Sequence, residues 1–236
     1  MRNSTSSLSL RPIPPLEPGD HLTRAEFERR FDATPGLKRA ELLEGIVFIP
    51  PRVRTCKHGH AHSTLTGCLC HYAGFTAGVL GAHSASVRLD DNNMPQPDSL
   101  LFILHGGQAH IDEDDYLAGP PELAGEIASS SVSIDLHKKK SIYRKFGVQE
   151  YVVWRVDDRE VDWFKLTNND FVPLPRHPSG QLRSEVFPGL WLDVDALVAQ
   201  NWHQLKTVLQ QGLASPEHTA FVARLATQAP PPATAP

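Results

Sequence analysis

Short apolar runs separated by turn residues predict a chain that folds mainly as a sheet. Runs rich in β-branched and aromatic residues, bounded by Gly, Pro, Asn or Asp, are typical of strands. The segment 42–49 is interrupted at Gly45 and predicts a hairpin that ends at Pro50 and Pro51. The other expected strands cover residues 79–80, 86–89, 99–104, 123–128, 151–156, 161–166 and a stretch near Phe171.

Helical periodicity predicts a smaller number of helices. Thr23 and Glu26 form a capping box ahead of a short helix that runs through Phe31. The other expected helices span residues 58–72, 134–146 with Gly147 as the terminating residue, 195–213 and 216–226. Strand runs that enclose few helices favour a mixed α/β sheet with one side covered.

Prolines are concentrated at both ends of the chain. Eight of the 20 prolines lie among the first 19 or the last seven residues, which predicts disordered ends. The length of 236 residues suits one globular domain, and we find no internal repeat. We therefore predict a disordered tail over 1–19, a globular domain over 20–197, a C-terminal helical extension over 198–228 and a disordered Pro/Ala tail over 229–236.

Composition excludes some classes of protein. The net charge of −4 disfavours a protein that coats nucleic acid through a generally basic surface, although a local basic groove remains compatible with it. No apolar run approaches ~20 residues, so we expect no membrane-spanning segment. The first fifteen residues lack the apolar core of a secretory signal. Three cysteines, an odd number, favour a reducing cytoplasm.

Lys139 is the most informative residue of the predicted helix 134–146. At ~100° per residue, Leu136, Ile142, Tyr143 and Phe146 form one apolar face, and Lys139 falls near its centre. A lysine directed at a core is costly unless an acid pairs with it or it lines a wet cleft. The alternative is that Lys139 extends past its apolar neighbours to water.

Three carboxylates lie in positions where they could meet that lysine. Glu126 stands inside an otherwise apolar strand, and Asp98 immediately precedes the apolar run 99–104. Glu44 lies beside Gly45 in the predicted hairpin, where an acid is usually a turn residue. Mg²⁺ is typically held by few carboxylates together with waters and phosphate oxygens. A lysine near such a site could stabilise developing negative charge or orient the attacking water.

Three of the twelve histidines fall between His58 and His62. On a helix, His58 and His62 share one face, and that spacing would suit a Zn²⁺ or Ni²⁺ site only with a third ligand from elsewhere. The alternatives are histidines that line a cleft or contact phosphate, and histidines that pack as neutral side chains. His62 continues onto the apolar face of its helix, so we expect it to face the sheet.

A basic stretch surrounds Lys139. The segment 137–145 holds no acid, and its other cations are Lys138, Lys140, Arg144 and Lys145. These side chains either form a solvated helix face or flank a groove that binds a nucleic-acid backbone.

An ordered set of motifs resembles one family of nucleases. The set comprises Pro97-Asp98, Gly125-Glu126-Ile127-Ala128, the spacing of Asp135, Lys139 and Tyr143, and the stretch Phe146–Trp154. The stretches 41–45 and 187–190 fit as well, so the resemblance runs from about Thr23 to about Leu197. In these features the chain resembles the Uma-two-like family of bacterial proteins, which are assigned as restriction endonucleases within the PD-(D/E)XK nuclease superfamily.

The resemblance implies a restriction-endonuclease-like fold over 20–197, a central mixed sheet flanked by helices, with the C-terminal helices added to it. It implies that Asp98 and Glu126 hold a metal ion, with Glu44 as a further acid. Ala128 stands where the superfamily usually places a lysine two residues after the glutamate. The family supplies that lysine from the following helix, and Lys139 occupies the matching position.

These observations together predict a Mg²⁺- or Mn²⁺-dependent endonuclease that hydrolyses phosphodiester bonds in DNA. The expected catalytic residues are Asp98, Glu126, Lys139 and Glu44, and the expected substrate-binding residues are His62, His58, Lys138, Lys140 and Arg144. A homodimer would suit cleavage of both strands. Two alternatives remain: an inactive module of the same fold that binds nucleic acid or a protein partner, and a zinc-dependent hydrolase centred on His58 and His62.

Overall fold

A computed structural model of the chain describes residues 12–50, 58–129 and 131–229. The helical segments are α1 (Arg24–Asp32), α2 (His60–Gly74), the π-helix η2 (Ile134–Lys139), α3 (Lys140–Phe146), α4 (Val194–Val198), α5 (Trp202–Leu213) and α6 (Pro216–Gln228). The strands are β1 (Glu41–Leu43), β2 (Ile46–Phe48), β3 (Val79–Ala82), β4 (Val87–Arg88), β5 (Ser99–Ile103), β6 (His110–Ile111), β7 (Leu117–Ala118), β8 (Leu123–Ala128), β9 (Glu150–Arg155), β10 (Glu160–Thr167), β11 (Asp170–Pro173), β12 (Gln181–Arg183) and β13 (Trp191–Asp193).

The centre of the molecule is a six-stranded mixed sheet in the order β11-β10-β9-β8-β5-β3. Strands β8 and β9 are parallel, and every other neighbouring pair in this sheet is antiparallel. The parallel pair requires a crossover, which η2 and α3 provide between β8 and β9. The predicted fold class, a central mixed sheet flanked by helices, is confirmed.

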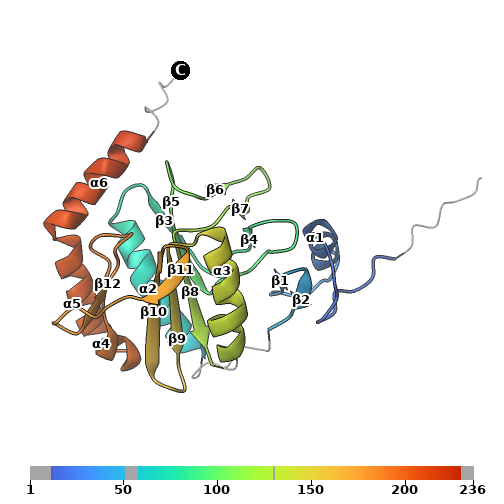
Figure 1. Ribbon diagram of the computed structural model, residues 1–236, viewed down its shortest axis with the longest axis horizontal. Coiled ribbons are helices and arrows are strands. Elements are labelled where there is room, and N and C mark those ends of the chain that lie inside the picture. The colour runs from blue at the N-terminus through green and yellow to red at the C-terminus, as the bar shows by residue number, and fades with distance from the viewer. Residues whose placement is uncertain (1–11, 51–57, 130, 230–236) are drawn as a thin grey trace, which may run out of the picture.

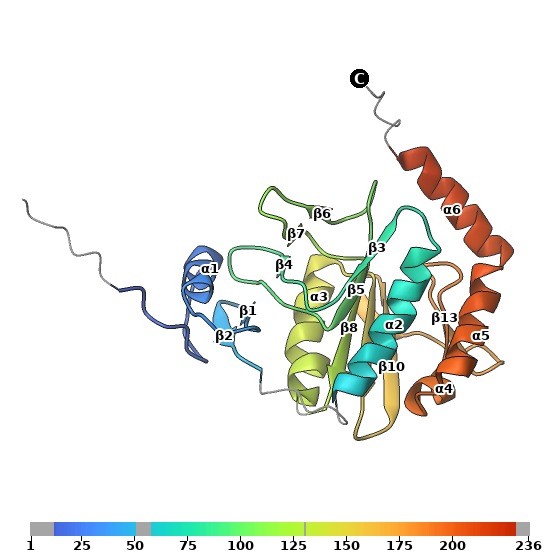
Figure 2. The ribbon, with the colours of Figure 1, turned by 180° about the vertical axis from the view of Figure 1, so that it is seen from behind.

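Helices cover both faces of this sheet, and our expectation from the patterns alone that one side is covered was therefore wrong. Figure 1 shows α3 in front of the sheet and α2 behind it, and Figure 2 shows the same layers from the other side. Side chains alternate across β8, so Leu123 and Ile127 pack in the core under α2, and Ala124 and Ala128 pack in the core under α3. A strand buried on both faces shows no alternation in its sequence.

The predicted elements were largely correct. The capping box is partly present, since Thr23 Oγ1 accepts a hydrogen bond from the backbone N–H of Glu26 at 3.5 Å. Gly147 ends α3 with a φ of 84°. The helix expected over 195–213 is in fact two helices, because Asn201 caps a new one and accepts a hydrogen bond from the backbone of Gln204. Strands β6, β7, β12 and β13 were missed, because two or three residues are too few to show a period.

The N-terminal hairpin β1–β2 lies beside η2 and α3, away from the C-terminal helices (Figures 1 and 2). Its turn holds Glu44 and Gly45, with φ angles of 56° and 78°. Positive φ at both central positions is typical of a two-residue hairpin turn. A bridge between Leu42 and Met94 attaches the hairpin to the body of the protein.

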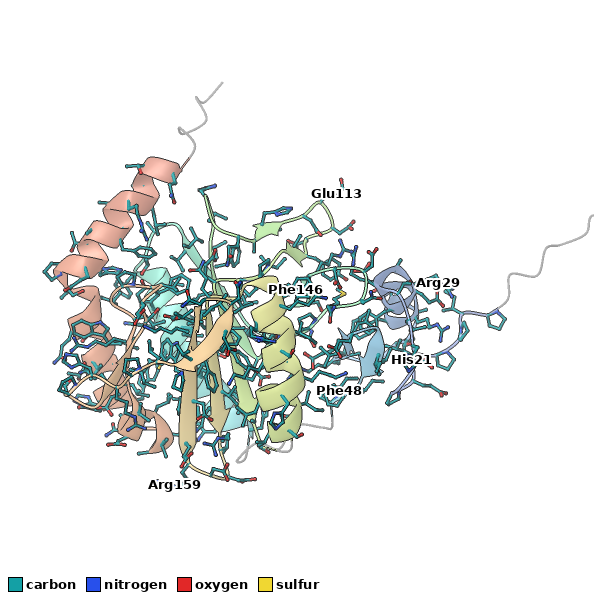
Figure 3. All side chains as sticks on the ribbon, in the orientation of Figure 1. His21, Arg29, Phe48, Glu113, Phe146 and Arg159 are labelled. Carbon is teal, nitrogen blue, oxygen red and sulfur yellow. The ribbon has the colours of Figure 1, made fainter. Side chains whose placement is uncertain are left out.

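The two predicted tails fall partly outside the described residues. Residues 1–11 and 230–236 are not described, whereas residues 12–19 are, and Leu16 among them is buried in a cluster with Phe27 and Leu42. Figure 3 shows the labelled Glu113 and Arg159 at the outer ends of the β6–β7 and β9–β10 loops. No helix in the described part of the chain is long and apolar enough to cross a membrane.

Candidate active site

Glu126 and Lys139 meet in the layer between the sheet and the crossover helix. Glu126 projects from β8 toward α3, like its alternate neighbours Ala124 and Ala128. Lys139 is the last residue of η2, and its Nζ lies 2.7 Å from Glu126 Oε1. The side chain of Lys139 is only 2% exposed, so it does not extend to solvent. Tyr143, one turn later, donates its hydroxyl to the same oxygen at 3.1 Å.

Two further acids surround the Lys139 ammonium group. Glu41 Oε1, from β1, lies 2.8 Å from Nζ, and Asp135 Oδ1 lies 3.9 Å from it. Glu41 is held in turn by the backbone N–H of Gln96 at 2.7 Å. The amine therefore joins the hairpin, which is distant in the sequence, to the neighbouring elements β8 and η2.

Asp98 lies immediately before β5 and is buried beside the same cluster. Its Oδ2 accepts the backbone N–H of Ile127 at 2.7 Å and lies 3.4 Å from His58 Nε2. Its Oδ1 lies 2.8 Å from the guanidinium nitrogen Nη1 of Arg39, but the alignment is that of an ion pair and Oδ1 accepts no hydrogen bond. Arg39 also donates from Nη2 to the Gln96 carbonyl at 3.0 Å.

The pKa values reflect burial and crowded charge. Burial raises the pKa of Glu126 well above its usual range, and the nearby Lys139 charge only partly opposes this, while Asp135 and Asp98 add to it. Burial would lower the pKa of Lys139, but the surrounding carboxylates outweigh it and raise that pKa. Burial would raise the pKa of Asp98, yet the hydrogen bond from His58 and the charge of Arg39 lower it overall. Lys139 is therefore a persistent cation and Asp98 a persistent anion.

Formal charge is unbalanced within the cluster. The buried acids are Glu41, Asp98, Glu126 and Asp135, and the cations that contact them are Lys139 and Arg39. Four acids against two cations leave two excess negative charges if all ionise. Two things would balance these negative charges. One is protonation of groups with a raised pKa, such as Glu126 and Asp135, and the other is an added divalent cation.

The chemistry of these residues, though not their present arrangement, suits a hard divalent cation. The atoms that could coordinate a metal ion are carboxylate oxygens. Among them, Asp98 Oδ1 is a buried hydrogen-bond acceptor that receives no hydrogen bond. No group of three or more His, Cys, Asp or Glu side chains within the described ranges is arranged to hold a metal ion. Mg²⁺ needs only one or two carboxylates because waters and substrate oxygens complete its shell.

Glu44 does not take part in this cluster. It lies in the hairpin turn, 57% exposed, with Oε2 3.0 Å from Lys138 Nζ. Glu41, three residues earlier, makes the contact with Lys139 that we expected of Glu44. The sequence signal for Glu41 was the one used for Glu126, a carboxylate directly beside apolar strand residues, here Leu42 and Leu43.

The other cations of the helix each have a partner. Lys140 Nζ lies 3.4 Å from the centre of the Phe164 ring, and Arg144 Nη1 lies 3.5 Å from Asp170 Oδ1. Lys145 Nζ lies 3.8 Å from Asp90 Oδ2. These residues surround the helix rather than converge with Lys139.

The two histidines contact different parts of Asp98. The His58 and His62 rings are stacked with their centroids 5.9 Å apart, and His62 Nε2 lies 2.9 Å from the Asp98 carbonyl. A carbonyl oxygen only accepts, so His62 Nε2 carries the proton and donates it. Both histidines therefore orient the Asp98 segment.

Comparisons with known proteins agree with this fold. The model of the Uma2 family, described as "Putative restriction endonuclease", matches residues 24–195. A crystal structure of a protein from Anabaena variabilis ATCC 29413, described as "a putative nuclease belonging to DUF820", is similar with a TM-score of 0.58 and 17% identity, covering 75% of this chain and 98% of that one. No curated protein matches the chain. Because the family model spans well over half of the sequence, the chain belongs to the Uma2 family.

Proposed function

We propose that the chain is a Mg²⁺- or Mn²⁺-dependent endonuclease that hydrolyses phosphodiester bonds in DNA. The observation that carries the proposal is the buried contact between Glu126 and the Lys139 ammonium group, with the buried Asp98 close enough for its charge to act on both. Membership of a family described as restriction endonucleases supports the same reaction class.

Each residue has a chemical role in this proposal. Asp98 and Glu126 would hold the divalent cation, which when bound supplies Lewis-acid polarisation of the phosphate. Lys139 would stabilise the negative charge that develops on the phosphate oxygens. Glu41 and Tyr143 would position this pair, through the contacts at 2.8 Å and 3.1 Å described above.

The expected substrate-binding cations would have to exchange partners. Lys138, Lys140 and Arg144 contact Glu44, Phe164 and Asp170, so phosphate would replace these groups. The two surface ion pairs are worth roughly 0–1 kcal/mol each and the cation–π contact of Lys140 roughly 0.5–1 kcal/mol, so such an exchange costs little. Phosphate contacts by these residues would make DNA binding sensitive to salt.

The test is cleavage of supercoiled plasmid and of a single-stranded oligonucleotide. Purified protein is incubated with Mg²⁺, with Mn²⁺ or with EDTA, beside Lys139→Ala and a matched control, Lys165→Ala, whose exposed amine pairs with Glu185. We expect metal-dependent cleavage by the wild type and by Lys165→Ala, and none by Lys139→Ala. Equal cleavage by all three proteins would remove Lys139 from the mechanism.

An inactive module of the same fold is a second candidate, favoured by the deep burial of Lys139 among acids. It predicts salt-sensitive DNA binding that is indifferent to divalent metal, without cleavage.

A zinc hydrolase has weaker support, because His62 Nε2 is bound to a backbone carbonyl. Metal analysis of the purified protein, with His58→Ala/His62→Ala as the comparison, tests that alternative. Sedimentation of the protein with and without duplex DNA tests the proposed homodimer.

A further inference from the structure

Unsatisfied buried polar atoms gather at one place in the protein. Buried side-chain atoms without a hydrogen-bond partner, within the described residues, are Arg24 Nε, Arg39 Nε, His58 Nδ1, His71 Nε2, Gln96 Oε1 and Asp98 Oδ1. Four of these six belong to Asp98, to residues that contact it, or to Gln96, which binds Arg39. Buried polar groups in folded proteins nearly always have partners, so a cluster of exceptions indicates a place where a ligand or water belongs.

The unsatisfied atoms around Asp98 include both a hydrogen-bond donor and an acceptor. Arg39 Nε is a donor, and Asp98 Oδ1 is an acceptor. An anionic oxygen, such as one of a phosphate group, would satisfy the donor. The acceptor already lies 2.8 Å from the Arg39 cation.

Arg39 is suited to bind the anion. Its Nη2 is fixed on the Gln96 carbonyl, and its Nη1 lies against Asp98, which leaves Nε as the unused edge of the guanidinium plane. The side chain is 20% exposed, but Nε itself is buried, so the guanidinium group has to turn before Nε can meet a ligand. A planar guanidinium fork matches the spacing of phosphate oxygens.

We propose that Arg39 is a substrate-binding residue of this site and donates hydrogen bonds to the phosphate of the nucleic-acid backbone. The inference rests on the proposed function and adds a residue that the sequence motifs did not indicate. In the absence of substrate, Arg39 compensates the charge of Asp98, and it turns its free edge to phosphate when nucleic acid binds.

The test measures DNA binding without cleavage. Anisotropy of a fluorescein-labelled duplex is recorded in EDTA at several NaCl concentrations for the wild type, Arg39→Gln and Arg39→Lys. The matched control is Arg183→Gln, on β12, where the guanidinium stacks on Trp191. We expect Arg39→Gln to weaken binding roughly 10- to 100-fold, as for loss of a charged hydrogen bond. The slope of log affinity against log salt should fall by about 1.

Arg39→Lys keeps the charge beside Asp98 but lacks the planar fork. We expect it to keep the salt slope and to bind several-fold more weakly than the wild type, and it carries the test if Arg39→Gln does not fold by circular dichroism. The inference would be overturned if Arg39→Gln and Arg39→Lys had the DNA affinity and the salt slope of the wild type. It would also be overturned if Arg183→Gln weakened binding as much as Arg39→Gln. If the wild-type protein did not bind DNA at all, both the role of Arg39 and DNA as the proposed substrate would be overturned. Binding that depends on Arg39 without any metal-dependent cleavage would instead overturn only the endonuclease activity.

Discussion

Lys139 Nζ lies 2.8 Å from Glu41 Oε1 and thereby connects the crossover segment of the central sheet to the N-terminal hairpin. The hairpin packs on its own small core, which includes Phe27, Leu42 and Val47. The ion pair extends this contact into the buried acid cluster. The hairpin is therefore a structural part of the candidate active site and not an appendage of the sheet.

Replacing Lys139 should expose how strongly the acid cluster depends on its amine. Lys139→Met keeps the length of the side chain but leaves Glu41, Glu126 and Asp135 without their cation. Breaking one side of a buried ion pair costs roughly 3–5 kcal/mol. We expect a loss of that size in the free energy of unfolding, measured by urea denaturation at pH 7.

A double variant separates charge from packing. Lys139→Met/Glu126→Gln removes one uncompensated carboxylate and should recover part of the lost stability. Lys165→Met, at an exposed pair with Glu185, should change stability by less than about 1 kcal/mol. Additive effects of the two substitutions in the double variant would show that Lys139 and Glu126 are not energetically coupled.

Glu41 and Glu44 provide a matched comparison within one hairpin. Glu41→Ala leaves the Gln96 N–H unpaired and lets Lys139 shift, so we expect plasmid cleavage to fall roughly 10- to 100-fold. Glu44→Ala removes only an exposed contact with Lys138, and cleavage should stay within about twofold of the wild type. Initial rates of plasmid nicking with Mg²⁺ measure both. A larger loss in Glu44→Ala than in Glu41→Ala would restore Glu44 to the site.

The sequence predicted that Lys139 and Glu126 each point toward the buried side of their own helix or strand. A helical wheel placed Lys139 on the apolar face, and an acid in an apolar strand marked Glu126. Glu41 carries the same signal, but the prediction named Glu44, which lies beside Gly45 and which the family resemblance implied as a further acid. The structure separates the two acids, since Glu44 lies in the turn with its side chain 57% exposed and Glu41 lies in β1 with its side chain 2% exposed.

Contacts between distant segments could not be predicted. Arg39 meets Asp98, and Lys145 meets Asp90, across long stretches of chain, and no local pattern encodes which loops adjoin. For the same reason the basic stretch 137–145 left a solvated helix face and a nucleic-acid groove both open, because the acids that pair with Lys138, Arg144 and Lys145 lie elsewhere in the sequence. The covering of both sheet faces was hidden as well, since it depends on how the crossover is routed.

Glu150 should make stability depend on pH. It is buried in β9 and accepts hydrogen bonds from Ser184, Trp163 and the backbone of Glu185 and Val186. Burial raises its pKa above the usual 4.5, although these donors partly oppose the shift. The folded state therefore binds its proton more tightly than the unfolded state, and this contribution to stability is complete below about pH 4 and lost as pH rises through the raised pKa.

Glu150→Gln tests that dependence. Its amide group would face donors, so we expect a loss of roughly 1–3 kcal/mol near pH 7. The fall in stability with rising pH should also become shallower than in the wild type. Urea denaturation at pH values from 4.5 to 8 measures both effects, and parallel pH profiles for the two proteins would contradict the raised pKa.

Divalent metal should stabilise the folded protein through Asp98. A ligand that binds only the folded state adds RT ln(1 + [L]/Kd), which is about 1.4 kcal/mol at a tenfold excess over Kd. For a chain of this length that corresponds to a rise in the thermal midpoint of roughly 3–6 °C. We expect such a rise with Mg²⁺ or Mn²⁺ in the wild type, reversed by EDTA.

Asp98→Asn removes a negative charge from a crowded cluster and can raise the midpoint without metal, so the quantity to compare is the increment that metal adds. That increment should be abolished in Asp98→Asn and retained in Asp158→Asn, whose carboxylate pairs with Arg155 at the tip of the β9–β10 hairpin. An equal increment in both variants would mean that the cation binds elsewhere on the acidic surface, and the excess charge of the cluster would then be balanced by protons alone.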